Sequence, residues 1–94
     1  MFEIRVAGDG QVIVSGRLYA AQTQRVREVF QGLSSPTTVD CAGLEYIATA
    51  GVTELLDLYK RLSAAGHSLR LVNVTPPVRT VLTYLGFDKL FGIT

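Results

Sequence analysis

Apolar and polar residues alternate near the start of the chain in the period-two pattern of a strand with one solvent-facing side. Residues Phe2–Val6 alternate most clearly, and Gln11–Ser15 follows as a second predicted strand. Between them, Gly8-Asp9-Gly10 has the composition of a hairpin turn. We therefore predict an antiparallel hairpin whose second strand is ended or bulged at Gly16.

Three later segments carry apolar residues at the spacing of amphipathic helices. The first two are Gln22–Leu33 and Ala50–Ala65, with Gly66 as the residue that ends the second. The third follows Thr75-Pro76-Pro77, an N-cap with prolines in the first turn, and ends at Gly86. In the second helix the predicted buried stripe is Val52, Leu55, Leu56, Tyr59 and Leu62.

Charged residues occupy the helix faces that this pattern leaves exposed. Arg25 and Arg27 lie on the polar side of the first helix, where we expect solvated charges. Asp57 and Arg61 in the second helix are spaced as an i, i+4 ion pair, which we also expect to be exposed.

The remaining apolar segments indicate parallel strands. Thr37–Cys41 and Ser68–Val74 each follow a predicted helix, which is the order of a crossover connection. A glycine-containing turn is predicted from Asp40 to Ile47, and the apolar tail Phe87–Ile93 is predicted to dock as a short turn or edge strand. The predicted fold class is α/β: one domain, residues 1–94, with a mixed β-sheet (N-terminal hairpin plus parallel crossover strands) packed with amphipathic helices.

Composition narrows the classes of function. A net charge of +1 gives no support for binding nucleic acid or an anionic membrane. No apolar run approaches the roughly 18 residues of a membrane span, and the first residues do not resemble a signal peptide, so we expect a cytoplasmic protein without membrane insertion. The single Cys41 excludes an internal disulfide and is expected to be a small buried apolar residue.

The sequence offers no catalytic set, and we expect a protein that is not an enzyme. His67 follows a predicted helix end, where histidine is an ordinary residue. Asp40 and Glu45 lack a His or Cys to complete a metal site, and no glycine-rich phosphate loop occurs. We expect neither a cofactor nor a metal.

Thr49 is the one residue that suggests chemistry. It is the only hydroxyl residue in the small-residue turn Ala48–Gly51, at the predicted start of the second helix. The residues alone leave two interpretations open, because an N-cap threonine and a phosphoacceptor would occupy the same place.

The second half of the chain resembles the STAS domain family of bacterial anti-sigma factor antagonists, most strongly over Thr38–Ile93 and more loosely through Val14–Leu18. The motif positions are held here by Asp40, Tyr46-Ile47, Ala48-Thr49-Ala50-Gly51-Val52, Tyr59-Lys60, Gly66, Leu69–Val72, Thr75-Pro76 and Gly86-Phe87. The resemblance implies a regulatory module that binds an anti-sigma factor of the serine/threonine kinase type and is released when the kinase phosphorylates the motif hydroxyl.

The residue that matches this phosphoacceptor is Thr49. Two positions depart from the family pattern, since Ala48 and Tyr19 replace acidic residues. We expect these changes to slow phosphorylation while partner binding is retained. An alternative within the same family is a STAS subunit of an ABC-type lipid transport complex, which would pack on the ATPase of that complex.

The predicted partner surface is the segment before the second helix together with its first turns. Tyr46 and Ile47 are its candidate anchors, although the sequence allows both to be core residues. The full predicted set is Leu44, Tyr46, Ile47, Ala48, Thr49, Ala50, Gly51, Val52, Thr53 and Glu54.

Overall fold

The computed structural model describes residues 1–93, which form one five-stranded sheet and three α-helices. The strands are β1 (Glu3–Gly8), β2 (Gln11–Leu18), β3 (Thr37–Ile47), β4 (Leu69–Val72) and β5 (Gly92–Ile93). The helices are α1 (Thr23–Gln31), α2 (Thr49–Ala64) and α3 (Pro76–Tyr84), and a short 3₁₀ helix, η1 (Ala20–Gln22), precedes α1.

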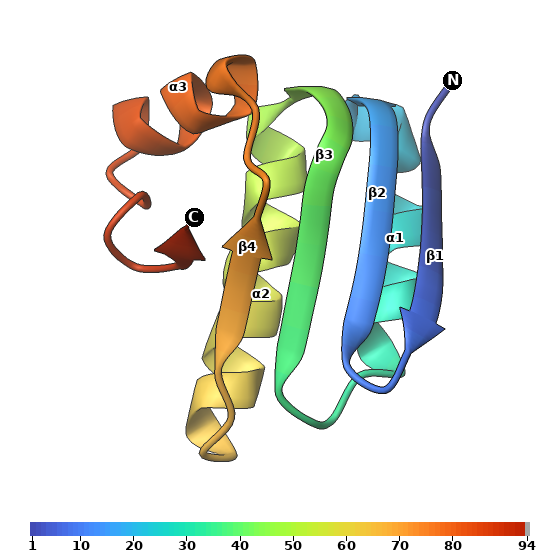
Figure 1. Ribbon diagram of the computed structural model, residues 1–94, viewed down its shortest axis with the longest axis vertical. Coiled ribbons are helices and arrows are strands. Elements are labelled where there is room, and N and C mark those ends of the chain that lie inside the picture. The colour runs from blue at the N-terminus through green and yellow to red at the C-terminus, as the bar shows by residue number, and fades with distance from the viewer. Residues whose placement is uncertain (94) are drawn as a thin grey trace.

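The strands lie in the sheet in the order of the chain, from β1 to β5. β1 is antiparallel to β2, and every later pair is parallel, as the predicted hairpin and crossovers require. Figure 1 shows α1 and α2 side by side behind the sheet, with α3 at the end of β4. The predicted fold class is therefore confirmed, and the tail does dock as an edge strand, β5.

The prediction for β3 was wrong in length. The strand continues through Ile47, and the segment predicted as a turn pairs in parallel with the end of β2. Two irregularities in the register allow this continuation, one between Ile13 and Ser15 and one at Gly16. A Cβ atom on Gly43 would lie only 2.8 Å from the Ser15 Cβ, so the glycine permits the close strand contact. Pairing with β2 therefore overrides the local turn signal.

The second strand also extends past its predicted end at Ser15. Gly16, with φ of +86°, lies inside β2 at the shift in register, so it forms the irregularity rather than the terminus. The strand ends at Leu18, and η1 begins two residues later at Ala20.

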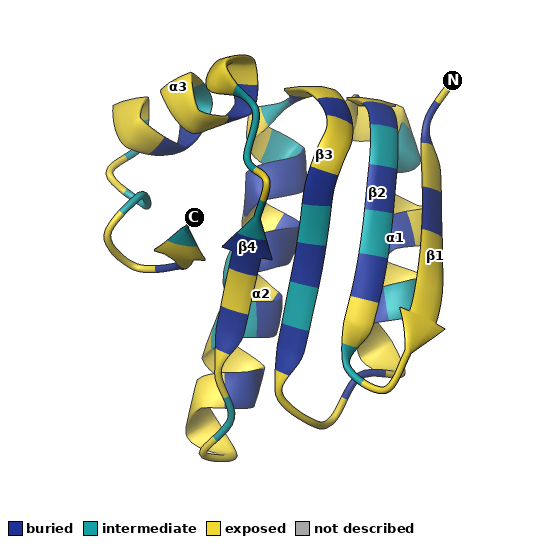
Figure 2. Cartoon of the chain, in the orientation of Figure 1, coloured by how far each residue is buried: buried dark blue, intermediate teal, exposed yellow. Residues whose placement is uncertain are grey.

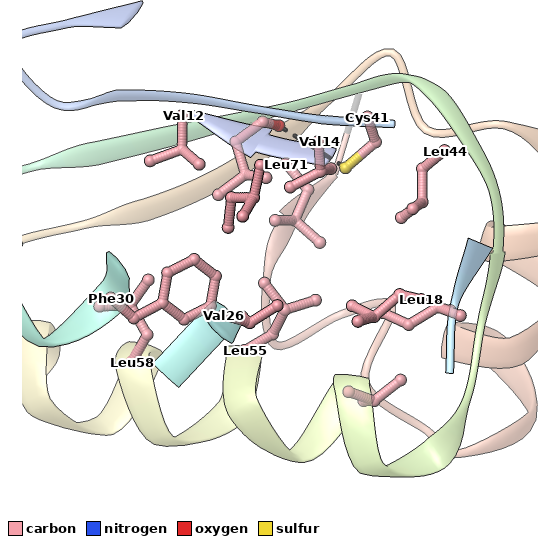
Figure 3. Packing of buried hydrophobic residues seen from close by; sticks show 14 of the residues in the cluster. Val12, Val14, Leu18, Val26, Phe30, Cys41, Leu44, Leu55, Leu58 and Leu71 are labelled. Carbon is pink, nitrogen blue, oxygen red and sulfur yellow. Dashed lines mark hydrogen bonds between the residues drawn. The ribbon is translucent and has the colours of Figure 1, made fainter. Parts of the chain in front are cut away.

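The core lies between the sheet and the helices behind it (Figure 2). Figure 3 shows Val26 and Phe30 of α1 pointing toward Leu55 and Leu58 of α2 beneath the sheet residues. Fully buried apolar residues come from every layer, and the largest of them are Val12, Val26, Val39, Ile47, Val52, Leu58, Leu62, Leu71, Val78 and Leu82.

The buried face of α2 differs from the predicted stripe. Leu58 is 2% exposed and takes a core position, whereas Leu56 and Tyr59 are only partly buried. Tyr59 packs edge-on against Phe91 of the tail, with ring centroids 5.8 Å apart. The buried face of α2 is therefore centred closer to Leu58 than the sequence suggested, and the tail covers Tyr59 at the edge of that face.

Two predictions about charged residues were also wrong. Arg61 does not pair with Asp57; its guanidinium donates hydrogen bonds to the carbonyl oxygens of Leu33 and Phe30, at 2.6 and 2.5 Å, near the C-terminal end of α1. Arg27 is paired with Glu54 of α2 rather than free in solvent. Both arginines therefore connect α1 to α2.

The predicted ends of α2 and α3 are confirmed. Gly66 and Gly86 both have positive φ, near +80°, directly after the two helices. The His67 amide donates to the Leu62 carbonyl and the Phe87 amide to the Leu82 carbonyl, which satisfies carbonyl groups of the last turns. Thr75 is the N-cap residue of α3, but its hydroxyl donates to the Leu44 carbonyl of β3 at 2.7 Å.

Candidate functional site

The start of α2 is held close to the ends of β2 and β3. The Ala48 amide donates to the Leu18 carbonyl at 2.8 Å, which fixes the end of β3 against β2. Gly51 then packs directly on the core, since a Cβ atom there would lie 2.8 Å from Leu18 Cδ2 and 2.9 Å from Ile47 Cγ1. The small residues of this segment therefore allow close packing between the helix and the strands.

Thr49 is the first residue of α2, and Ala48 is the N-cap. No side-chain cap hydrogen bond is present at Ala48, and among the described residues the Thr49 hydroxyl has no hydrogen-bond partner. Only the Thr49 backbone carbonyl is used, as acceptor for the Thr53 hydroxyl at 3.2 Å. The N-cap interpretation of Thr49 was therefore wrong, and its exposed hydroxyl lies at the positive end of the helix dipole.

The structure divides the predicted partner surface in two. Its buried members are Leu44, Ile47, Gly51, Val52 and Glu54. Its exposed or partly exposed members are Tyr46, Ala48, Thr49, Ala50 and Thr53. Of the two candidate anchors, Ile47 is a core residue at 1% exposure and Tyr46 is 40% exposed. A partner that binds the folded domain can therefore contact only the second group of side chains.

Two side-chain contacts join the end of β2 and the residue that follows it to Tyr46 and its neighbour Glu45. The Tyr46 ring packs against that of Tyr19 with centroids 5.3 Å apart, and Arg17 lies 3.8 Å from the Glu45 carboxylate. The Tyr19 side chain, and after it Glu45, raise the pKa of Arg17. Tyr19 is 46% exposed and Tyr46 is 40% exposed, so the two tyrosines together form an exposed aromatic surface.

A groove of about 290 Å³ lies between this site and α3. Tyr46, Ile47 and Thr49 form one wall, and the other is formed by Thr80, Val81, Tyr84 and Leu85. Tyr84 is 88% exposed although it is large and aromatic. The sequence analysis missed the α3 wall, because nothing in the helical pattern indicates which residues of α3 face a segment more than thirty positions earlier.

A metal site, a reactive cysteine and a membrane-spanning helix are all absent from the described part of the chain. Residues 1–93 contain no group of three or more His, Cys, Asp or Glu side chains placed to hold a metal ion. Burial raises the pKa of the Cys41 thiol to about 12, so this buried cysteine is an apolar core residue and a poor nucleophile. None of the helices in this range has the length and hydropathy needed to cross a membrane.

Fold and site together define a small α/β module with an exposed hydroxyl and tyrosines beside an apolar groove. The family model described as "Mlab, STAS domain" matches residues 4–92. The chain therefore belongs to the STAS domain family.

Three similar proteins show the range of this likeness. A stretch of 49 residues, 52% of the chain, is 45% identical to the human Sulfate anion transporter 1 and covers 7% of that protein. The structure of the anti-sigma factor antagonist SpoIIAA in its unphosphorylated form has a TM-score of 0.78 at 21% identity, covering 100% of this chain and 88% of that one. The Bacillus cell fate determinant SpoIIAA in its phosphorylated form has a TM-score of 0.72 at 19% identity, covering 100% and 91%.

Proposed function

We propose that this protein is a non-enzymatic, cytoplasmic regulatory module of the anti-sigma factor antagonist type, which binds an anti-sigma factor of the serine/threonine kinase type. The main support is the exposed Thr49 hydroxyl at the first position of α2, beside the groove that Tyr84 lines. Support also comes from the structural likeness to SpoIIAA, which is described as an anti-sigma factor antagonist.

The proposed contact surface consists of exposed groups from three elements: Tyr46 of β3, Thr49 and Thr53 of α2, and Tyr84 of α3. Tyrosines provide large contact areas at low conformational cost and are enriched among residues that dominate binding energy. Ala48 and Ala50 between them permit close approach of a partner backbone. The partner would therefore bind mainly through apolar and hydrogen-bonding contacts rather than ion pairs.

Phosphorylation of Thr49 is the proposed means of release. A phosphate would add a charge of about −1.5 to −2 at the centre of this surface. Its desolvation under a bound partner would cost more than the helix dipole returns, which is about 0.3–1 kcal/mol at an exposed helix end. SpoIIAA has been solved in both an unphosphorylated and a phosphorylated form, which supports a switch of this kind.

The test is a pull-down from the native host with tagged protein and identification of the captured partners by mass spectrometry. The wild-type chain should recover an anti-sigma kinase, and Thr53→Arg should reduce the recovery at least about tenfold, because it places a long charged side chain on the contact surface. Ser63→Arg is the matched control, since Ser63 is also exposed on α2 but lies near its other end. Recovery of a transporter ATPase with the same dependence on Thr53 would instead support the lipid-transport alternative.

A further inference from the structure

β1 is the terminal strand of the sheet, so one of its edges pairs with β2 and the other has no neighbouring strand among the described residues. The opposite terminal strand, β5, has only two residues. Figure 1 shows that no helix or loop passes beyond β1. Unpaired strand edges present amide and carbonyl groups that another strand can bind.

The residues of this edge form a self-complementary sequence. Phe2-Glu3-Ile4-Arg5-Val6 reads apolar, acidic, apolar, basic, apolar, and is symmetric about Ile4 apart from the reversal of charge. In an antiparallel pair of two such strands centred on Ile4, Glu3 would lie opposite Arg5 of the second copy, and Phe2 opposite Val6. Each apolar residue would meet an apolar one and each charge its opposite.

The structure places these side chains on the faces that such a pair requires. Phe2 and Ile4 point into the core and are 5% and 6% exposed, so the alternation of a strand places Glu3 and Arg5 on the opposite, solvent-facing side. Val6 is 52% exposed although it is apolar. The only irregularity in β1 lies between Val6 and Gly8, beyond the self-complementary segment.

We propose that two copies of this chain associate through their β1 edges, antiparallel and centred on Ile4, to form a continuous ten-stranded sheet. The two-fold axis would run perpendicular to the sheet, which keeps the helices of both copies on the same side. Each dimer would contain two Glu3–Arg5 pairs, and the second copy would cover Val6. The β1 edge is separate from the groove at Thr49, so this inference does not rest on the proposed function.

Sedimentation velocity over roughly 10 µM to 1 mM protein tests the association. This high concentration range is needed because an interface made by one short strand from each copy is small and is expected to be weak. The wild-type chain should form dimers toward the top of this range. Glu3→Arg and Arg5→Glu should each weaken the dimer about tenfold or more, because each places like charges opposite one another at both pairs. Arg70→Glu changes the charge by the same amount as Arg5→Glu, at an exposed position of the interior strand β4, and should have no effect.

Charge exchange decides whether the proposed register is correct. The double variant Glu3→Arg/Arg5→Glu should recover the wild-type dimer, and a mixture of the two single variants should form a heterodimer. Circular dichroism melts on every variant separate loss of association from loss of folding. A wild-type chain that stays monomeric throughout the range would overturn the proposal, as would a double variant as weak as the single ones or an equal loss with Arg70→Glu.

Discussion

Arg27 of α1 holds the buried carboxylate of Glu54 in α2 through two hydrogen bonds, 2.8 Å from Nη2 to Oε2 and 3.2 Å from Nε to Oε1. Glu54 is 5% exposed, whereas the Arg27 side chain remains half exposed. The hydrogen bond to Glu54, supported by the negative charge of that carboxylate, raises the pKa of Arg27. The pair therefore connects two helices through a charge that could not be buried alone.

Removal of Arg27 should destabilise the fold. Arg27→Met would leave the Glu54 carboxylate buried without its charged partner, so the melting temperature should fall by several degrees. Replacing both residues, as in Arg27→Met/Glu54→Met, should recover part of the loss because no unpaired buried charge remains. Arg25→Met on the exposed side of α1 is the control, and equal effects at both arginines would argue against the pair as the cause.

Leu58 should contribute more to stability than Leu56. Leu58→Ala removes a side chain that is 2% exposed and should cost about 2–5 kcal/mol of unfolding free energy. Leu56→Ala should cost clearly less, since Leu56 is only partly buried. Urea unfolding of the two variants measures the difference. The observed orientation of α2 would be contradicted if Leu56→Ala had the larger effect.

Cys41 should make stability fall at alkaline pH. Burial, and to a smaller extent Asp40, raises the pKa of the thiol from 9.0 to about 12, so the folded protein retains this proton in a range where the unfolded chain loses it. The folded state then binds more protons than the unfolded state, and stability decreases with pH between these two values.

The measurement is the unfolding free energy of the wild-type chain and of Cys41→Ala at several pH values. The difference between them isolates the thiol from tyrosines and lysines that titrate in both proteins. Relative to Cys41→Ala, the unfolding free energy of the wild-type chain should fall by up to about 1.4 kcal/mol per pH unit, once the pH exceeds the pKa of the thiol in the unfolded chain. A difference that stays constant over this range would show that the buried thiol is not responsible.

Thr49 should control partner binding and contribute little to stability. Thr49→Ala should bind as the unmodified protein does and change the unfolding free energy by less than about 0.5 kcal/mol, because the hydroxyl is exposed and does not cap the helix. Thr49→Glu should weaken binding by mimicking part of the phosphate charge. Thr83→Glu is the control at another exposed threonine.

Incubation with the captured kinase and ATP, followed by intact-mass measurement, tests phosphorylation itself. We expect slow modification at Thr49, since Ala48 provides no carboxylate to orient the hydroxyl. Rapid and complete modification would contradict the expected rate. A phosphate on another residue, or normal binding by Thr49→Glu, would remove Thr49 from the mechanism.

The sequence by itself determined the parts of this protein that depend on local patterns. The hairpin at Gly8–Gly10, the amphipathic helices and their glycine ends at Gly66 and Gly86 all appear where periodicity and turn chemistry predicted them. The α/β class follows from the alternation of strands and helices along the chain. The resemblance to the STAS family around Thr49 likewise depends only on the residue types and their spacing in the sequence.

Only the tertiary structure decided features that depend on contacts between distant segments. β3 extends to Ile47 because β2 pairs with it, Leu58 replaces Leu56 in the core, and Glu54 is buried because Arg27 approaches from another helix. The groove beside Thr49 exists because α3 packs against the end of β3. Local pattern gives the period of a buried face, but the exact direction of that face is set by the elements that pack on it.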